Sequence, residues 1–313
     1  MKVIKVSPRG FCEGVINALR VAINAANDKS LPRPIHILGN IVHNHYISDA
    51  LTQLGLITIE NKSKTRLELL ENIEKGTVIF TAHGISDEVV NKAREKGLYL
   101  INATCKYVNK TYDYIKDKVN NGYDVIYIGK RGHPEAEGAI SINPQKVHLV
   151  ESISDVKSLI IENLKVTITN QTTMSYWDVE NLVQEIKKIY PYSQYTNEIC
   201  NATQLRQEAV LKKAILADVT IVVGDPLSNN TSKLAEVSEN LANRKAYRIE
   251  SVEDINPEWF KNCETVAVTS GASTPTAITN EVISFLENFD YNDKRTHISK
   301  SNLTLKDILP NIK

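Results

Sequence analysis

The 313-residue sequence predicts an α/β fold made of three related domains in a pseudo-threefold arrangement. Two observations lead to this prediction. Cys12, Cys105 and Cys200 are separated by 93 and 95 residues, and similar segments surround each of them. Within each interval, apolar runs with strand character alternate with helical periodicity, which is typical of mostly parallel sheets. A period near 95 residues is too long for a solenoid unit, so each repeat is expected to be a domain.

Each repeat is expected to begin with a strand, a cysteine and a helix. The extended segments "KVIKVSPRGFC", "LYLINATC" and "SQYTNEIC" end at the three cysteines. The segments that follow, "EGVINALRVAINAAN", "KYVNKTYDYIKDKVNNG" and "NATQLRQEAVLKKAILA", repeat apolar residues at steps of three and four, which predicts amphipathic helices.

The rest of each repeat is expected to hold three more strands. "IHILGNIVHN", "DVIYIGKRGHPEAEG" and "VTIVVGDPLSNN" indicate a buried strand, a glycine turn and a polar loop. Short strands follow, ending at Glu60, Glu151 and Glu250, and then "TVIFTAHG", "KVTITNQTT" and "TVAVTSGAS". The expected domains are residues 1–97, 98–193 and 194–290. The polar segment 291–313 lies outside the repeats, and either folding back or a loose tail is compatible with its composition.

The bulk composition is that of an ordinary soluble globular protein, with 42% hydrophobic and 24% charged residues. Lys+Arg and Asp+Glu both number 37, so no global field recruits nucleic acid or an acidic membrane. The N-terminus lacks the apolar core of a signal peptide, and no run has the length of a membrane span. We therefore expect a cytoplasmic protein with no nucleic acid and no membrane partner.

Polar side chains gather just after the predicted strands, where open α/β sheets bind ligands. They are His43, His83, His133, Thr172, Ser228, Asn230 and Ser273. A single histidine is usually structural, but three at strand ends favour a phosphate or diphosphate pocket, and no Walker motif points to a nucleotide. Glu135 has two readings. It suits the first turn of a helix that starts at Pro134, and it also suits a general acid in a donor-rich pocket.

The three repeated cysteines predict a metal centre with one open coordination position. An iron–sulfur cube held by three thiolates fits best, and a zinc ion with three Cys and one His remains the alternative. Cys263 has no counterpart in the other repeats and is expected to be a structural thiol.

These residues together resemble a known family. The segments "PRGFCEGV", "AHG", "ATC", "GHPEAEG", "QTT", "ICNAT" and "SGAS" occur in the order found in 4-hydroxy-3-methylbut-2-enyl diphosphate reductases, the IspH/LytB family. The resemblance extends from about residue 1 to residue 290. It implies a trefoil of three α/β domains around a central 4Fe–4S cluster, and reductive dehydroxylation of an allylic alcohol diphosphate to isopentenyl and dimethylallyl diphosphate.

The resemblance also implies residue roles. Cys12, Cys105 and Cys200 would hold the cluster, Glu135 would relay protons, and Thr172 would lie near the substrate hydroxyl. The expected substrate-binding residues are His43, His83, His133, Thr172, Ser228, Asn229, Asn230 and Ser273, with His133 also in the catalytic set. Asn229 replaces a serine that is usual in the family, and its amide can still donate a hydrogen bond.

The absence of a G-x-G-x-x-G fingerprint argues against direct hydride transfer from a nicotinamide, so a ferredoxin or flavodoxin is expected as electron donor. Two alternatives stay open. One is a three-cysteine dehydratase of the quinolinate-synthase type, against which the histidines and the "GHPEAEG" loop argue. The other is a non-catalytic iron–sulfur sensor or zinc-stabilised module, for which the balanced charge offers no DNA-reading surface.

Overall fold

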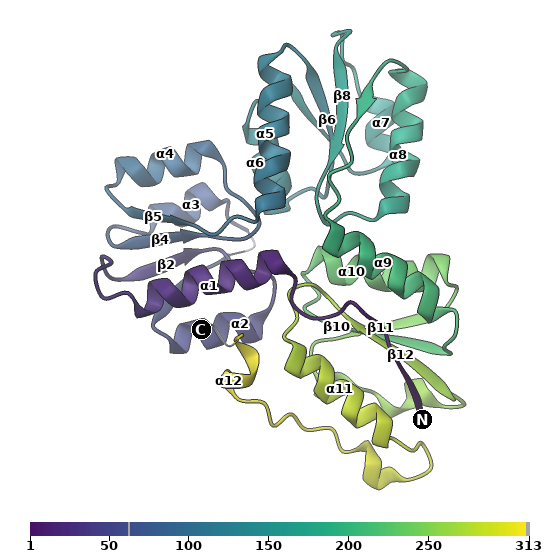
Figure 1. Cartoon of the computed structure of the whole chain (residues 1–313). Coiled ribbons are helices and arrows are strands. Elements are labelled where there is room, and N and C mark those ends of the chain that lie inside the picture. Colours follow the sequence, from purple (N-terminus) through teal and green to yellow (C-terminus); the bar gives the residue numbers. More distant parts are fainter. Residues whose placement is uncertain (62, 311–313) are drawn as a thin grey trace. The chain divides into compact units, whose positions relative to one another are not determined.

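The structure contains three four-stranded parallel sheets with one and the same strand order. It is a computed structural model that describes residues 1–61 and 63–310. Sheet A has the order β1-β12-β10-β11, sheet B the order β5-β4-β2-β3, and sheet C the order β9-β8-β6-β7 (Figure 1). All pairings in these sheets are parallel. The prediction of three parallel-sheet α/β units is therefore confirmed.

The chain divides into two compact units. One comprises residues 1–16, 43–50 and 201–310 and contains sheet A. The other comprises residues 17–42, 51–61 and 63–200 and contains sheets B and C. Helices α1 (Glu13–Asn27) and α2 (His45–Gln53) each have residues in both units.

Sheet B is built from short, fully or partly buried strands. They are β2 (Ile35–Leu38), β3 (Leu56–Ile59), β4 (Thr77–Phe80) and β5 (Tyr99–Asn102). Helices α3 (Arg66–Glu71) and α4 (Asp87–Glu95) pack on one face, where Leu70, Phe80 and Val89 form part of a buried cluster. Thr65 begins α3 with a capping box, which satisfies backbone N–H groups that the first turn leaves without partners.

Sheet C lies between two layers of helices, as Figure 1 shows. Its strands are β6 (Asp124–Ile128), β7 (Val147–Val150), β8 (Val166–Asn170) and β9 (Gln194–Tyr195). Side chains alternate along each strand, so Val125 and Tyr127 pack against α5 (Lys106–Asn120) and α6 (Pro134–Ser141). Ile126 and Ile128 pack on the other face, against α7 (Ile153–Ser158) and α8 (Tyr176–Ile189). Burial on both faces explains why β6 and β8 read as continuous apolar and β-branched runs.

Sheet A combines the N-terminal strand with strands from the last third of the chain. Its members are β1 (Lys2–Lys5), β10 (Val219–Val223), β11 (Lys245–Ile249) and β12 (Thr265–Ser270). Its helices are α9 (Asn201–Ala214), α10 (Asn229–Glu236) with a π-helical continuation (Val237–Leu241), and α11 (Thr276–Asn288). Two 3₁₀ turns follow β11 (Val252–Asp254 and Pro257–Phe260).

Each cysteine-bearing strand completes the sheet of the preceding repeat. β5 and β9 pair with β4 and β8, the strands just before them in the chain, as sequential strands usually do. β1 occupies the equivalent edge position beside β12. The division into domains at residues 97, 193 and 290 stays a prediction, but the sheets place these three strands differently from the repeats defined by sequence.

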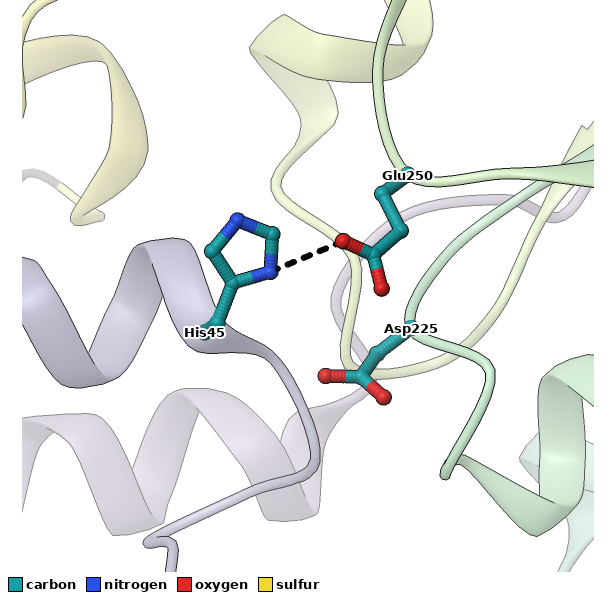
Figure 2. A group of neighbouring side chains, drawn as sticks. All are labelled: His45, Asp225 and Glu250. Atoms are coloured by element: carbon teal, nitrogen blue, oxygen red, sulfur yellow. Dashed lines mark ion pairs between the residues drawn. The ribbon is translucent and has the colours of Figure 1, made fainter. Parts of the chain in front are cut away.

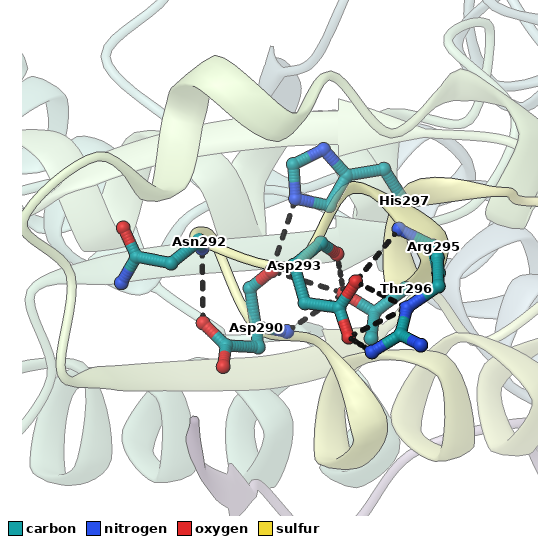
Figure 3. A network of polar contacts seen from close by, with 6 residues as sticks. All are labelled: Asp290, Asn292, Asp293, Arg295, Thr296 and His297. Carbon is teal, nitrogen blue, oxygen red and sulfur yellow. Dashed lines mark hydrogen bonds and ion pairs between the residues drawn. The ribbon is translucent and has the colours of Figure 1, made fainter.

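The C-terminal segment folds back onto its own unit. Figure 3 shows its first turn, where Arg295 pairs with Asp293 at 2.7 Å and the Thr296 hydroxyl donates to the Asp290 carbonyl at 3.0 Å. Further on, Ser301 bonds Glu281 of α11, and the short helix α12 (Leu305–Ile308) contacts α11. Of the two possibilities left open by composition, the folded-back tail is the one observed through residue 310.

Among the residues that the structure describes, no helix combines the length and apolarity that crossing a bilayer requires.

Candidate active site

All the candidate residues follow the carboxyl ends of strands. Six of them lie two to five residues after the end of a strand. In the order β2, β4, β6, β8, β10 and β12, the residues are His43, His83, His133, Thr172, Ser228 and Ser273. The cysteines follow the three edge strands β1, β5 and β9. In parallel sheets these ends lie on one edge, so the candidates of each sheet share that edge.

Glu135 is the most enclosed charged group of the candidate set. Its side chain is 1% exposed, although it stands in the first turn of α6. The backbone N–H of Thr172 donates to Oε1 at 2.7 Å, and the Thr172 hydroxyl donates to Oε2 at 2.9 Å. Thr172 follows β8, the sheet neighbour of β6, so the pairing of these two strands brings the residues together.

Burial raises the pKa of Glu135 to about 7, while the two hydrogen bonds from Thr172 and the nearby Tyr127 hydroxyl act in the opposite direction. Desolvation disfavours a charged carboxylate, and donated hydrogen bonds stabilise it. The Tyr127 hydroxyl is fully buried and makes no hydrogen bond of normal geometry within residues 1–61 and 63–310. A carboxyl with a pKa of about 7 is present in both protonation states at neutral pH, which suits proton transfer.

His133 caps the helix that carries Glu135. Its Nδ1 accepts the backbone N–H of Glu135 at 3.2 Å, and Pro134 occupies the first helical position. An acceptor Nδ1 in a neutral imidazole leaves the proton on Nε2, so this ring can donate from Nε2. The rings of His133 and His83 lie edge to face with centroids 5.6 Å apart. The predicted helix start at Pro134, with Glu135 in the first turn, is therefore confirmed, and the same glutamate is a buried acid.

The candidates near sheet A form a second set. Ser228 caps α10 by accepting the N–H of Thr231, and Asn229 and Asn230 follow in its first turn, both buried. The Asn230 amide oxygen accepts the N–H of Ala272 at 3.0 Å, which ties this loop to the one after β12. There the Ser273 hydroxyl donates to the backbone carbonyl of His43 at 3.0 Å.

The three cysteines occupy equivalent positions. The backbone N–H groups of Cys12, Cys105 and Cys200 donate to the carbonyls of Ala272, Ala82 and Thr172 at 3.1, 3.0 and 3.0 Å. Each of these carbonyls follows the strand that pairs with the cysteine-bearing edge strand. Each cysteine also stands directly before a helix, α1, α5 or α9.

Cys263 differs from these three. It lies half-buried between the 3₁₀ turn Pro257–Phe260 and β12, and its thiol donates to the Thr265 carbonyl at 3.5 Å. Burial and the Asp218 carboxylate raise its pKa to about 11. Such a thiol stays protonated at neutral pH, as a structural cysteine should.

The structure thus brings the candidates together in two groups. His83, Cys105, His133, Glu135, Thr172 and Cys200 belong to the unit with sheets B and C. Cys12, His43, Ser228, Asn229, Asn230 and Ser273 belong to the unit with sheet A.

Comparison with known proteins decides the family. The model of the family described as LytB protein matches residues 3–287 of the chain. The chain belongs to the LytB family.

Curated relatives in this family are similar over the whole length. A protein of Geobacillus sp. (strain WCH70) named 4-hydroxy-3-methylbut-2-enyl diphosphate reductase is 56% identical over 313 residues, covering 100% of this chain and 99% of the relative. The Bacillus subtilis (strain 168) protein of the same name is 55% identical with the same coverage.

Two solved structures are also similar. The E-1-hydroxy-2-methyl-but-2-enyl-4-diphosphate reductase of Plasmodium falciparum superposes with a TM-score of 0.85 at 34% identity, covering 93% of this chain and 89% of that one. A structure described as (E)-4-hydroxy-3-methyl-but-2-enyl diphosphate reductase, the terminal enzyme of the non-mevalonate pathway, has a TM-score of 0.64 at 33% identity, covering 92% and 100%.

Sequence reasoning on this LytB-family chain missed the tyrosines around Glu135. Tyr112 of α5 donates to the Glu135 carbonyl at 2.9 Å, and Tyr127 of β6 points its hydroxyl toward the carboxylate region. Gly138 lies so close to Tyr112 that a Cβ there would come within 2.0 Å of its hydroxyl. The period-2 alternation along "DVIYI" is a signal that puts Tyr127 on the same sheet face as α6.

Proposed function

We propose that this chain converts (E)-4-hydroxy-3-methylbut-2-enyl diphosphate to isopentenyl and dimethylallyl diphosphate, the last step of the non-mevalonate isoprenoid pathway. The reaction breaks the C–O bond of an allylic alcohol, forms a C–H bond and releases water, and it consumes two electrons and two protons. Membership of the LytB family and the names of full-length relatives support this substrate and reaction. The observation on which the proposal rests most is the buried carboxyl of Glu135, whose pKa of about 7 fits a proton donor.

In this proposal Glu135 protonates the leaving oxygen. Its carboxyl is held by two donors from Thr172, so it has one orientation and does not rotate away from the substrate. Thr172, whose hydroxyl contacts Oε2, completes the path by which the proton reaches the substrate hydroxyl. A positioned acid of this kind contributes about 10²–10⁴-fold to a rate.

The histidines and the polar side chains near sheet A would bind the diphosphate. His133 offers its Nε2–H, because its Nδ1 already accepts a backbone N–H. His43, His83, Ser228, Asn229, Asn230 and Ser273 complete the donor set. The N-termini of α6 and α10 add helix dipoles that favour an anion at the same sheet edges. Fixing the diphosphate and the hydroxyl end together limits the substrate to one pose, and orientation alone supplies part of the rate.

Cys12, Cys105 and Cys200 would hold a 4Fe–4S cluster with one open iron. The donor set fits this group, because three cysteines, the residues that hold iron–sulfur clusters, stand at equivalent backbone positions. When bound, such a cluster supplies electrons and a Lewis-acidic iron for an oxygen ligand. We further propose that a ferredoxin or flavodoxin delivers these electrons singly, since the sequence lacks a dinucleotide fingerprint.

An anaerobic assay tests the proposal. Purified protein reconstituted with iron and sulfide is incubated with the allylic alcohol diphosphate and an artificial one-electron reductant, and the products are separated by chromatography. Both isomeric diphosphates should form, and only when the reductant is present. Glu135→Gln should keep substrate binding and lose turnover by about 10²–10⁴-fold. Dehydration without reductant, or no conversion by a fully loaded protein, would refute the assigned reaction.

A further inference from the structure

A histidine and two carboxylates meet at the carboxyl edge of sheet A, apart from every residue assigned above. Asp225 directly follows the glycine after β10, Glu250 directly follows β11, and His45 begins α2. One ligand atom from each residue lies within 4.8 Å of the others. Figure 2 shows the imidazole facing both carboxylates, with Nδ1 of His45 3.1 Å from Oε2 of Glu250. All three residues belong to the same compact unit.

Asp225 adds an observation that an ordinary ion pair would not require. Its side chain is 8% exposed, and one carboxylate oxygen accepts the N–H of Leu227 at 2.7 Å. The other oxygen has no hydrogen-bond or ion-pair partner within the described part of the chain. Asp225 therefore places a second carboxylate within 4.8 Å of Glu250, and two neighbouring carboxylates favour a cation between them. Figure 2 shows this side chain beside the gap between His45 and Glu250.

The other two sheets provide an internal comparison. Glu60 and Glu151 stand at the positions equivalent to Glu250, because the glycine N–H groups of residues 39, 129 and 224 donate to the carbonyls of Ile59, Val150 and Ile249 alike. Glu60 accepts a loop N–H and pairs with an arginine, Arg66, at 3.1 Å. Glu151 accepts the backbone N–H of Arg131 at 3.1 Å, and the Arg131 guanidinium pairs with Asp155 at 3.6 Å.

In sheet A these partners are replaced. The residue after Asp225 is Pro226, which has no N–H to donate, and the arginine positions have no counterpart that pairs with Glu250 among the residues described. Burial raises the pKa of Glu250, the His45 imidazole opposes this, and the charges of Asp225 and Asp254 raise the pKa further. In sheet A, a second carboxylate and an imidazole thus stand where sheet B has an arginine side chain and sheet C has a backbone donor.

From this geometry we infer that His45, Asp225 and Glu250 bind one divalent transition-metal ion. An imidazole with two carboxylates suits Mn²⁺, Fe²⁺, Co²⁺ or Zn²⁺ better than Mg²⁺ or Ca²⁺, which take oxygen ligands. The His45 side chain is 46% exposed, so water completes the coordination from the solvent side. The ion would tie the start of α2, two residues after His43, to the loop that leads into Ser228. Its role would be to fix these two substrate-binding segments against each other, without contact with the substrate.

Manganese is the probe for the experiment, because thiolates bind it weakly and the cysteines do not compete. Reconstituted protein without a polyhistidine tag is titrated with Mn²⁺ under anaerobic conditions, and free Mn²⁺ is followed by electron paramagnetic resonance. One equivalent should bind per chain, and spin-echo modulation should show a coordinated ¹⁴N. His45→Gln should abolish that modulation, and Asp225→Asn and Glu250→Gln should each weaken binding at least tenfold.

The matched control is Glu151→Gln, which makes the same change at the equivalent position of sheet C. It should change Mn²⁺ affinity less than twofold. The asparagine in Asp225→Asn keeps an oxygen that can accept the Leu227 N–H. Weaker Mn²⁺ binding by that variant therefore does not result from disruption of the local turn. The inference is wrong, and the cluster is an ion pair only, if no Mn²⁺ binds below millimolar concentration or if no ¹⁴N modulation is seen. The same conclusion follows if Glu151→Gln weakens Mn²⁺ binding as much as Glu250→Gln does. Because the readout is metal binding, these outcomes do not depend on the proposed reaction.

Discussion

Replacement of Thr172 by valine tests the proton-transfer role of Glu135 through its pKa. Valine keeps the backbone N–H bond to Oε1 and removes the hydroxyl bond to Oε2, which is 2.9 Å long. The hydroxyl stabilises the carboxylate form, so its removal raises the pKa. A hydrogen bond to a charged group is worth about 1.5–3 kcal/mol, and 1.36 kcal/mol corresponds to one pKa unit, so the rise is roughly one to two units. The pKa of Glu135 should therefore move from about 7 to roughly 8–9.

The expected signature is a shift of the alkaline limb of the pH–rate profile. A general acid acts in its protonated form, so kcat/KM should be high at low pH and fall above the pKa of the free enzyme. In the wild type this fall should centre near pH 7, and in Thr172→Val about one to two pH units higher. The absolute rate will also drop, because Thr172 is assigned a place beside the substrate, but the position of the limb does not depend on that drop. Ionisation of the substrate diphosphate is common to both proteins and cancels in the comparison.

Thr169→Val is the matched control. Thr169 lies in β8, the strand that leads to Thr172. It is fully buried, and its hydroxyl has no hydrogen-bond partner in the part of the chain described. The same Thr-to-Val change there should leave the limb within about 0.3 pH units of the wild type, since no bond to Glu135 is lost. A limb that stays at its wild-type position in Thr172→Val, or that moves equally in both variants, would refute the assignment of this carboxyl as the proton donor.

Three further predictions follow from the contacts described. Cys105→Ser should abolish the visible absorbance of the reconstituted cluster, whereas Cys263→Ser should keep it; equal loss in both variants would remove the distinction between them. Glu135→Gln should stabilise the protein at pH 8 but not near pH 4.5 in urea unfolding. The folded-state pKa of Glu135, about 7, exceeds its ordinary value, so the wild-type protein loses about 3 kcal/mol of stability as the pH rises from 4.5 to 7. An equal effect of the substitution at both pH values would contradict the raised pKa. Ile308→Ala should lower the free energy of unfolding by about 2 kcal/mol, since Ile308 is 5% exposed. Ile298 is 80% exposed, so Ile298→Ala should change it by less than about 0.5 kcal/mol. Similar effects of the two substitutions would show that the tail does not pack as described.

Much of the fold could be predicted because its signals are local. The fully buried runs "DVIYI" and "VTITN" are short and β-rich, and the helices between them show clear periodicity. The spacing of the cysteines disclosed the repeat, and the equivalent backbone bonds of Cys12, Cys105 and Cys200 agree with it.

The rest depends on pairings between distant segments. Nothing local in "KVIK" indicates that this strand pairs with β12 and not with a strand of its own repeat. The two bonds from Thr172 to Glu135 depend on β6 and β8 being neighbours, and the raised pKa depends on the burial that follows. The cluster of His45, Asp225 and Glu250 was not predicted for the same reason, since its members are separated by up to about two hundred residues and meet only in the folded unit.

The pairing of Lys2 with Thr265 has a consequence for how the protein is made. At usual translation rates of ~5–20 residues per second, β1 leaves the ribosome roughly 13–50 s before β12 is synthesised. Throughout that interval sheet A has no partner for its first strand, whereas sheets B and C can assemble from contiguous chain. Nascent chains arrested before residue 265 should therefore protect sheets B and C from protease but leave the first strand accessible.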